Sequence, residues 1–422
     1  MLWRSNLVLV RDCIAFNAKD TPISSTSRFG ILQSVCKIKK PVSNYKLTHY
    51  KHYRCNNFEI DPSFVKVIFI IKKSIFMRSI YFACTLLLFL NVMSAQETEP
   101  AAGTIEQEVS KWLTEAKVPG IAIASIENSK VHTILKGTDL EGKPITATTI
   151  FDVASLTKTI TTLTVLKLAQ QKKIDLDEPL YTYWIDPDVR EDLRHQKLTP
   201  RIILSHQSGF KNWRYLYEDK KLAFDFEPGT QFQYSGEGFE YLRKALEHKF
   251  DTSFEALADS LVFDPIGMEN SSLVWDDKIE ELAFAGAHDN EAQAYTYEKN
   301  YEANAADNLL TNLSDFVKLA KNLLDTNYLN AKGYAEMRLS HAKVREGIHF
   351  GLGWIVFQDL PNDEYAIFNA GSDKGVNALI LVLPQSKRAL IVLTNSDNGR
   401  GLAMKAIGSF LDTTGDEILA RF

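Results

Sequence analysis

The sequence has 422 residues, of which 45% are hydrophobic and 24% are charged, a composition typical of globular proteins. Residues 1–76 carry 13 Lys/Arg and 4 Asp/Glu, whereas residues 96–422 carry 34 Lys/Arg and 49 Asp/Glu. The acidic main part argues against a nucleic-acid partner, and the absence of cysteine after Cys84 excludes disulfides, thiolate zinc sites and a cysteine nucleophile from it.

Residues 77–95 have the pattern of a secretory signal peptide. Met77 and Arg78 give a basic start, an apolar run covers residues 80–90, and the small residues Ser94 and Ala95 precede a polar stretch. We expect cleavage after Ala95 and a periplasmic or secreted protein of the bacterial cell envelope. Residues 1–76 are then a spurious or disordered extension upstream of the true start. The alternative is an uncleaved membrane anchor over residues 64–95, which would bring membrane contact.

The elements of residues 96–422 place strands at both ends of this part and helices between them. Residues 105–116 predict a helix, residues 121–126 and 131–135 predict two strands, and a further helix opens near Ser155. Further strands are expected at residues 353–357, 365–369, 377–383 and 389–394, followed by a helix over 401–410. This order predicts an α+β fold whose antiparallel sheet takes strands from both chain ends, is flanked by helices, and is interrupted by a mostly helical insert over about 152–345.

Ser155 and Lys158 form an S-x-x-K motif at the start of the predicted helix. They lie one turn apart on the same helix face, so the lysine amine can reach the serine hydroxyl. A helix N-terminus favours developing negative charge, and a serine beside a base is the arrangement needed for acyl transfer. The structural alternative is a serine that only caps the helix.

Three further segments carry polar chemistry. Residues 227–230 form a turn before Tyr234, and a tyrosine beside a lysine can take part in proton transfer. Residues 369–375 contain two glycines at the end of a strand, which allow the backbone to approach a ligand or simply form a hairpin. His206, in a polar loop after an apolar stretch, is expected to have a structural or orienting role.

Other catalytic classes lack their motifs. Residues 137–144 imitate a phosphate-binding loop, but Pro144 stands where serine or threonine is required. The nine histidines show no zinc spacing, and the G-x-S-x-G motif of other serine hydrolases is absent. We therefore expect no metal and no cofactor.

Several motifs in order resemble those of the serine β-lactamase and penicillin-binding protein superfamily, in its class C-like branch. That branch includes β-lactamases, D-Ala-D-Ala carboxypeptidases, D-aminopeptidases and esterases. The resemblance covers residues 105–412 and rests on the motifs at 155–158, 204–209, 227–235, 350–354 and 369–371. It implies a β-lactamase/transpeptidase-like fold for residues 96–422.

The resemblance also implies residue roles. Ser155 is the acylated nucleophile, Lys158 takes part in proton transfer, and Tyr234 acts with Lys158 as base and then as acid to the leaving group. The backbone N–H groups of Ser155 and Ser372 form the oxyanion hole. The substrate-binding positions are Gly236, Asn369, Ala370 and Gly371.

Two of these positions depart from the motifs of that branch. Gly236 stands where asparagine normally ends the second motif, and Asn369 stands where lysine or histidine normally begins the third. We therefore expect a serine hydrolase that acts through an acyl-enzyme on a small-molecule or peptide substrate (an ester, an amide or a D-amino-acid peptide) and is a poor β-lactamase. The alternative is a non-catalytic cell-envelope binding protein that keeps the fold.

Overall fold

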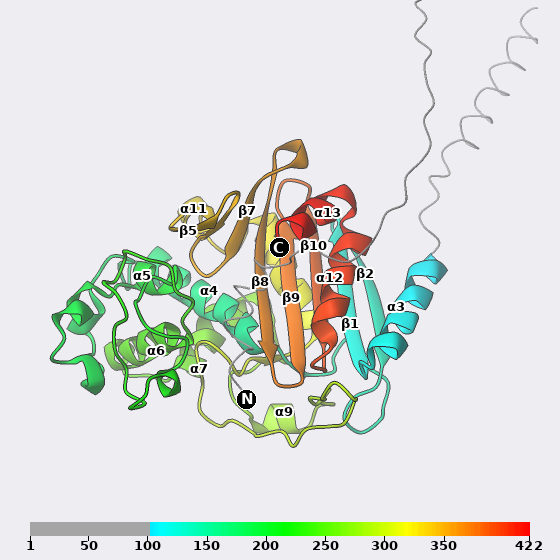
Figure 1. Ribbon diagram of the computed structural model, residues 1–422, viewed down its shortest axis with the longest axis horizontal. Coiled ribbons are helices and arrows are strands. Elements are labelled where there is room, and N and C mark those ends of the chain that lie inside the picture. The colour runs from blue at the N-terminus through cyan, green and yellow to red at the C-terminus, as the bar shows by residue number, and fades with distance from the viewer. Residues whose placement is uncertain (1–101) are drawn as a thin grey trace, which may run out of the picture. The chain divides into compact units, whose positions relative to one another are not determined.

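The computed structural model describes residues 102–422, which are built on one large antiparallel sheet (Figure 1). The predictions for residues 1–76, for the signal peptide at 77–95 and for an anchor over 64–95 lie outside the described residues. Among the residues that are described, no helix is long and apolar enough to cross a membrane.

The sheet has eight strands in the order β2-β1-β10-β9-β8-β7-β6-β5. Strands β1 and β10 pair in antiparallel register from Ile121↔Thr394 to Glu127↔Arg388, which joins the two ends of the described chain. This pairing confirms the predicted sheet with strands from both chain ends. The strands are β1 (Gly120–Glu127), β2 (Lys130–Gly137), β5 (Ala342–Arg345), β6 (Ile348–Phe350), β7 (Ile355–Leu360), β8 (Glu364–Asp373), β9 (Val376–Leu383) and β10 (Arg388–Thr394).

Helices cover both faces of this sheet. Successive side chains of a strand point to opposite faces, and in β10 Leu390 and Val392 pack in one hydrophobic cluster while Ile391 and Leu393 pack in another. The first cluster contains α3 (Ala102–Ala116), α12 (Gly399–Phe410) and α13 (Asp412–Ala420); the second contains α4 (Thr157–Gln170) and α10 (Leu313–Asp325). All eight residues of β9 are buried, which accounts for its almost continuous apolar sequence.

The region between β2 and β5 is mostly helical and is closed at its base by a second, two-stranded sheet. Strand β3 (Phe151–Asp152) pairs with β4 (Leu310–Thr311), so residues about 160 positions apart in the sequence lie side by side near Ser155. Besides α4 and α10, the helices of this region are α5 (Pro200–Leu204), α6 (Gly236–Phe250), α7 (Phe254–Ala258), α8 (Asp264–Ile266), α9 (Asp277–Glu280) and α11 (Ala331–Arg338).

Helix α4 is buried on nearly every side, although five of its residues are threonines. Four of the five threonine hydroxyls donate to carbonyl oxygens, among them Thr157 to Ala154 at 2.6 Å and Thr161 to Ala305 at 2.6 Å. Buried hydroxyls need such partners, and the bond to Ala305 ties the start of α4 to the segment that leads into β4.

The predicted boundaries differ from the observed ones in two informative places. A 3-10 turn, η1 (Ala154–Leu156), contains Ser155, and α4 begins only at Thr157. The strand expected from residue 353 begins at Ile355, because Gly353 has a φ of 71° and donates its N–H to the Leu204 carbonyl. Strands β5 and β6 and helix α13 were not predicted, since very short strands and terminal helices carry little periodic signal.

Candidate active site

Ser155 and Lys158 lie together at the junction of η1 and α4. Lys158 Nζ is 3.1 Å from Ser155 Oγ and donates at 2.8 Å to the carbonyl oxygen of Ala306. The lysine is 1% exposed and the serine 9% exposed. A buried amine held against a partly accessible hydroxyl has the geometry required of a base and its nucleophile.

The backbone that presents Ser155 is constrained on both sides. Ala154 has a φ of 47°, which is rare for a residue with a side chain, and its N–H donates to Asp152 Oδ1 at 2.8 Å. Asp152 in turn accepts a bond from the Tyr297 hydroxyl at 3.0 Å. Unusual backbone conformations of this kind are found where the surroundings enforce them.

Strand β8 passes directly against η1 at Gly371. A Cβ on Gly371 would lie 1.9 Å from the Val153 carbonyl oxygen and 3.0 Å from the Ser155 nitrogen. Only glycine therefore permits this approach, and it brings the edge of β8 to the nucleophile.

The N–H group of Ser372 points away from β9, into the same region. A two-residue turn joins Asp373 to Val376, and bonded and non-bonded pairs alternate along an antiparallel ladder. Ser372 is therefore in a non-bonded pair, and the last pairing of β7 with β8 is at Phe368. Its N–H therefore points away from β9, at the edge of β8 that β7 leaves unpaired beyond Phe368.

Tyr234 lies beside Lys158 and is backed by His206. Lys158 Nζ is 4.8 Å from the centroid of the tyrosine ring, and the His206 ring stacks on Tyr234 at 4.3 Å. His206 Nδ1 accepts the N–H of Ser235 at 3.1 Å, so this nitrogen carries no proton. Burial lowers the pKa of His206 well below its usual value, and the charge of Lys158 adds to that effect. The structural role expected for His206 is thus that of a neutral support for the tyrosine.

Gly236 lies under the indole of Trp213. A Cβ on this glycine would be 2.8 Å from Trp213 Cη2, and the glycine N–H donates to Asn212 Oδ1 at 2.8 Å. The indole of Trp213 therefore lies over the position from which an asparagine side chain would extend.

The amide of Asn369 is engaged within the protein. Its Nδ2 donates to the Gly353 carbonyl at 2.9 Å, and its Oδ1 accepts the N–H of Ala370 at 2.9 Å. Asn369 thus fastens β8 to the loop before β7. Ala370 and Gly371 follow it on the edge of β8 that faces Ser155.

Three carboxyl groups, those of Asp152, Asp307 and Asp373, belong to the segments that meet near Ser155. Burial raises the pKa of Asp152 to about 6. Burial also raises the pKa of Asp307 to about 8; the charges of Asp373 and Asp152 contribute to the rise and that of Lys158 opposes it. Asp307 directly follows Ala306, the carbonyl partner of Lys158. Perturbed carboxyl groups of this kind cluster at functional sites.

The structure brings Ser155, Lys158, Tyr234, Gly371 and the Ser372 backbone together, and adds residues that sequence reasoning missed. Ala306 and Asp307 come from the segment before β4, and Trp213 from a loop. None of these residues belongs to a recognisable motif. No local sequence pattern indicates that the segment before β4 packs against α4. Within residues 102–422, no group of three or more His, Cys, Asp or Glu is placed to hold a metal ion.

Comparison with known proteins identifies the family and the fold. The family model described as Beta-lactamase matches residues 102–408. Penicillin-binding protein 4* of Bacillus subtilis is 23% identical over 299 residues, covering 61% of this chain and 63% of the relative. The chain thus spans less than two thirds of the length of that curated relative.

Solved structures share the fold. The octameric penicillin-binding protein homologue from Pyrococcus abyssi matches with a TM-score of 0.65 and 23% identity, over 75% of this chain and 79% of that one. A β-lactamase/D-alanine carboxypeptidase from Pseudomonas syringae matches with a TM-score of 0.63 and 17% identity, over 74% of this chain and 98% of that one. At such identities the likeness shows the fold alone.

Proposed function

The chain belongs to the Beta-lactamase family, and from that premise we propose that it is a serine hydrolase that turns over an ester, an amide or a D-amino-acid peptide through a covalent acyl-enzyme. The observation that carries the proposal is the 3.1 Å contact of buried Lys158 with Ser155 Oγ. The apolar run at residues 80–90 further supports an enzyme of the periplasm or the medium.

The proposed reaction has two balanced steps. Ser155 Oγ attacks the substrate carbonyl, its proton passes to Lys158 or Tyr234, and the C–O bond forms. The N–H groups of Ser155 and Ser372 stabilise the oxyanion. The bond to the leaving group then breaks, and the leaving group takes the proton. A water molecule, deprotonated by the same pair, hydrolyses the acyl-enzyme and restores the serine hydroxyl.

The arrangement around Gly236 and Asn369 supports poor β-lactamase activity. Trp213 covers the glycine, and the Asn369 amide is used to fasten β8. Neither position offers a free polar side chain to a ring carboxylate or amide. The groups needed for simpler acyl transfer, Ser155, Lys158 and Tyr234, remain together.

The test is hydrolysis of p-nitrophenyl acetate and of a chromogenic cephalosporin by the full chain. We expect ester turnover that falls by at least about 1,000-fold in Ser155→Ala and in Lys158→Ala, as for other nucleophile and base variants. The cephalosporin is expected to react far more slowly. Equal ester rates in the parent and Ser155→Ala proteins would refute the proposal.

The same two departures favour one alternative, a cell-envelope binding protein that keeps the cleft without turnover. A stable acyl-enzyme that is never released, or ligand binding without acylation, would support this second function. Multiple turnovers of the ester by Ser155 exclude it.

A further inference from the structure

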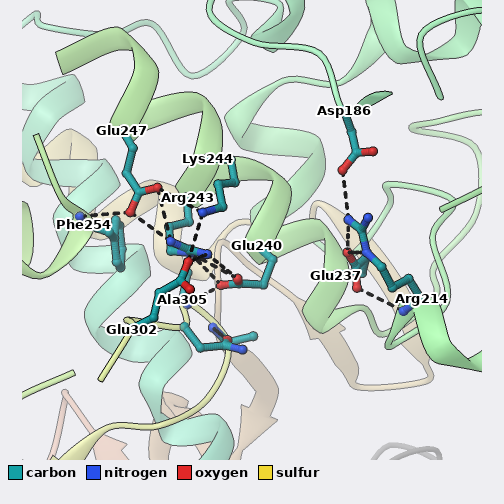
Figure 2. A network of polar contacts seen from close by, with 12 residues as sticks. Asp186, Arg214, Glu237, Glu240, Arg243, Lys244, Glu247, Phe254, Glu302 and Ala305 are labelled. Carbon is teal, nitrogen blue, oxygen red and sulfur yellow. Dashed lines mark hydrogen bonds and ion pairs between the residues drawn. The ribbon is translucent and has the colours of Figure 1, made fainter. Parts of the chain in front are cut away.

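A pocket of about 450 Å³ opens next to the candidate active site. Its lining includes the aromatic residues Trp184, Trp213, Tyr215 and Tyr241 together with Asn304; we call these five residues the aromatic pocket. Helix α6 supplies further lining residues, among them Glu237, Glu240 and Lys244, which Figure 2 shows in two polar networks along that helix.

Two residues of the pocket contact backbone segments that position Tyr234 and Lys158. Trp213 lies against Gly236, two residues after Tyr234. Asn304 Oδ1 accepts the N–H of Ala306 at 2.8 Å, and the carbonyl of Ala306 accepts from Lys158. Burial raises the pKa of the Tyr215 phenol, and the charges of Asp373 and Asp307 add to the rise. A substrate whose carbonyl is at Ser155 can therefore extend into the pocket.

The charged groups of the lining are paired with one another. Arg214 bonds Glu237 at 2.6 Å and Asp186 at 2.9 Å. Glu240 accepts from Arg243 at 2.9 Å and from the Ala305 N–H at 2.6 Å. Lys244 bonds Glu302 at 3.1 Å (Figure 2). Because each charge already has a partner, the lining offers no free counter-ion to a charged ligand, and burying one there would be costly.

The aromatic walls combine rigidity with open area. Trp184 is held edge-on to Tyr241 at 5.1 Å and stacked with His248 at 5.9 Å. Tyr215, by contrast, is 62% exposed. Aromatic rings gain from stacked or edge-to-face contacts with other rings, so these four rings suit a flat aromatic ligand.

We propose that the aromatic pocket is the specificity pocket of this enzyme and takes an uncharged aromatic ring of the substrate's acyl group. The inference rests on the proposed function and narrows its substrate class. It requires the substrate to be larger than a simple acetyl or alanyl compound, because a methyl group would leave the rings uncovered.

The first test compares p-nitrophenyl esters with the full chain. We expect kcat/KM for phenylacetate to exceed that for acetate by at least about tenfold, which corresponds to about 1.4 kcal/mol. Cyclohexylacetate and 4-(aminomethyl)phenylacetate, which lack the aromatic ring or add a charge, are expected to react more slowly than phenylacetate. Equal rates for acetate and phenylacetate, or a preference for the saturated or the charged ring, would overturn the inference.

Tyr215→Ala assigns the preference to the pocket. The side chain is exposed, so the variant is expected to fold, and it should lower kcat/KM for phenylacetate about fivefold to tenfold, mainly through KM, while acetate changes less than about twofold. Tyr301→Ala is the matched control, since Tyr301 is 72% exposed and does not line the pocket. An equal loss for both esters, or an equal effect of the control, would contradict the assignment.

A binding experiment separates failure of the pocket from failure of the catalytic proposal. In Ser155→Ala, phenylacetamide should quench the fluorescence of the pocket tryptophans saturably, whereas acetamide should not, and Tyr215→Ala added to it should weaken the effect. Saturable binding without ester turnover by the parent protein would support the proposed aromatic specificity of the pocket and contradict the proposed hydrolase activity. Turnover of the esters without any quenching by phenylacetamide would keep the hydrolase and reject the pocket.

Discussion

At the scale of single residues, the carboxyl groups of Asp152, Asp307 and Asp373 repel one another electrostatically and so destabilise the folded protein. Asp307 is half-buried next to the carbonyl partner of Lys158, and Asp373 and Asp152 are close enough for their charges to act on it. The charges of Asp373 and Asp152 disfavour ionisation of Asp307, because like charges in a partly desolvated site repel. Such a cluster favours function over stability, as active sites often do.

Asp307→Asn is therefore expected to stabilise the protein at alkaline pH. Between an unfolded pKa of about 4 and the folded pKa of about 8, the folded state keeps a proton that the unfolded state has released. Stability contributed by this proton is complete at low pH and is lost as pH rises to about 8. The asparagine variant removes that loss.

The free energy of unfolding of the full chain, measured in urea at pH 4 and pH 9, tests this prediction. We expect no gain at pH 4 and a gain of about 1–2 kcal/mol at pH 9, discounted for solvent screening from about 1.4 kcal/mol per pKa unit. Asp416→Asn, an exposed site on α13, serves as the control. A variant that is less stable than the parent at both pH values would show that Asp307 makes a stabilising interaction and is not destabilised by its neighbouring charges.

At the scale of elements, the site depends on the close contact between β8 and η1. The sequence pattern predicted a strand over residues 365–369, and the observed strand β8 continues to Asp373. It did not predict that Gly371 meets the Val153 carbonyl, because a close approach between segments more than 200 residues apart leaves no local periodicity. The contact of Trp213 with Gly236 and that of Ala306 with Lys158 also join separate segments, so local periodicity does not predict them either.

Gly371→Ala is expected to separate β8 from the nucleophile. The added Cβ would lie 1.9 Å from the Val153 carbonyl oxygen, so one backbone must move. We predict a loss of about 1–3 kcal/mol in stability and of about 100-fold or more in kcat for ester hydrolysis, similar to removal of an oxyanion donor.

Gly401→Ala is the matched control for that variant. Nothing lies within 4 Å of a Cβ at Gly401 in helix α12, so this change is expected to be neutral or slightly stabilising. Urea unfolding and ester kinetics measure both variants. An active and stable Gly371→Ala protein would show that the contact is not needed to align the site.

At the scale of the whole molecule, the fold joins strands from both ends of the described chain and places the site where the helical insert leaves and returns. Binary patterning made the sheet strands at 121–126, 377–383 and 389–394 predictable, since each is an apolar run bounded by turn residues. The irregular loops of the insert carry no such pattern. Their arrangement, and hence the aromatic pocket, follows from long-range packing alone.

The central claim is that Ser155 is an activated nucleophile, and the most direct test is the intact mass of the full chain after exposure to a serine-reactive phosphonate. We predict a single adduct that peptide mapping locates at Ser155, no adduct in Ser155→Ala, and an unchanged single adduct in Ser386→Ala, a serine in the turn between β9 and β10. No adduct on the parent protein, or an adduct that persists in Ser155→Ala, would contradict the proposed serine hydrolase.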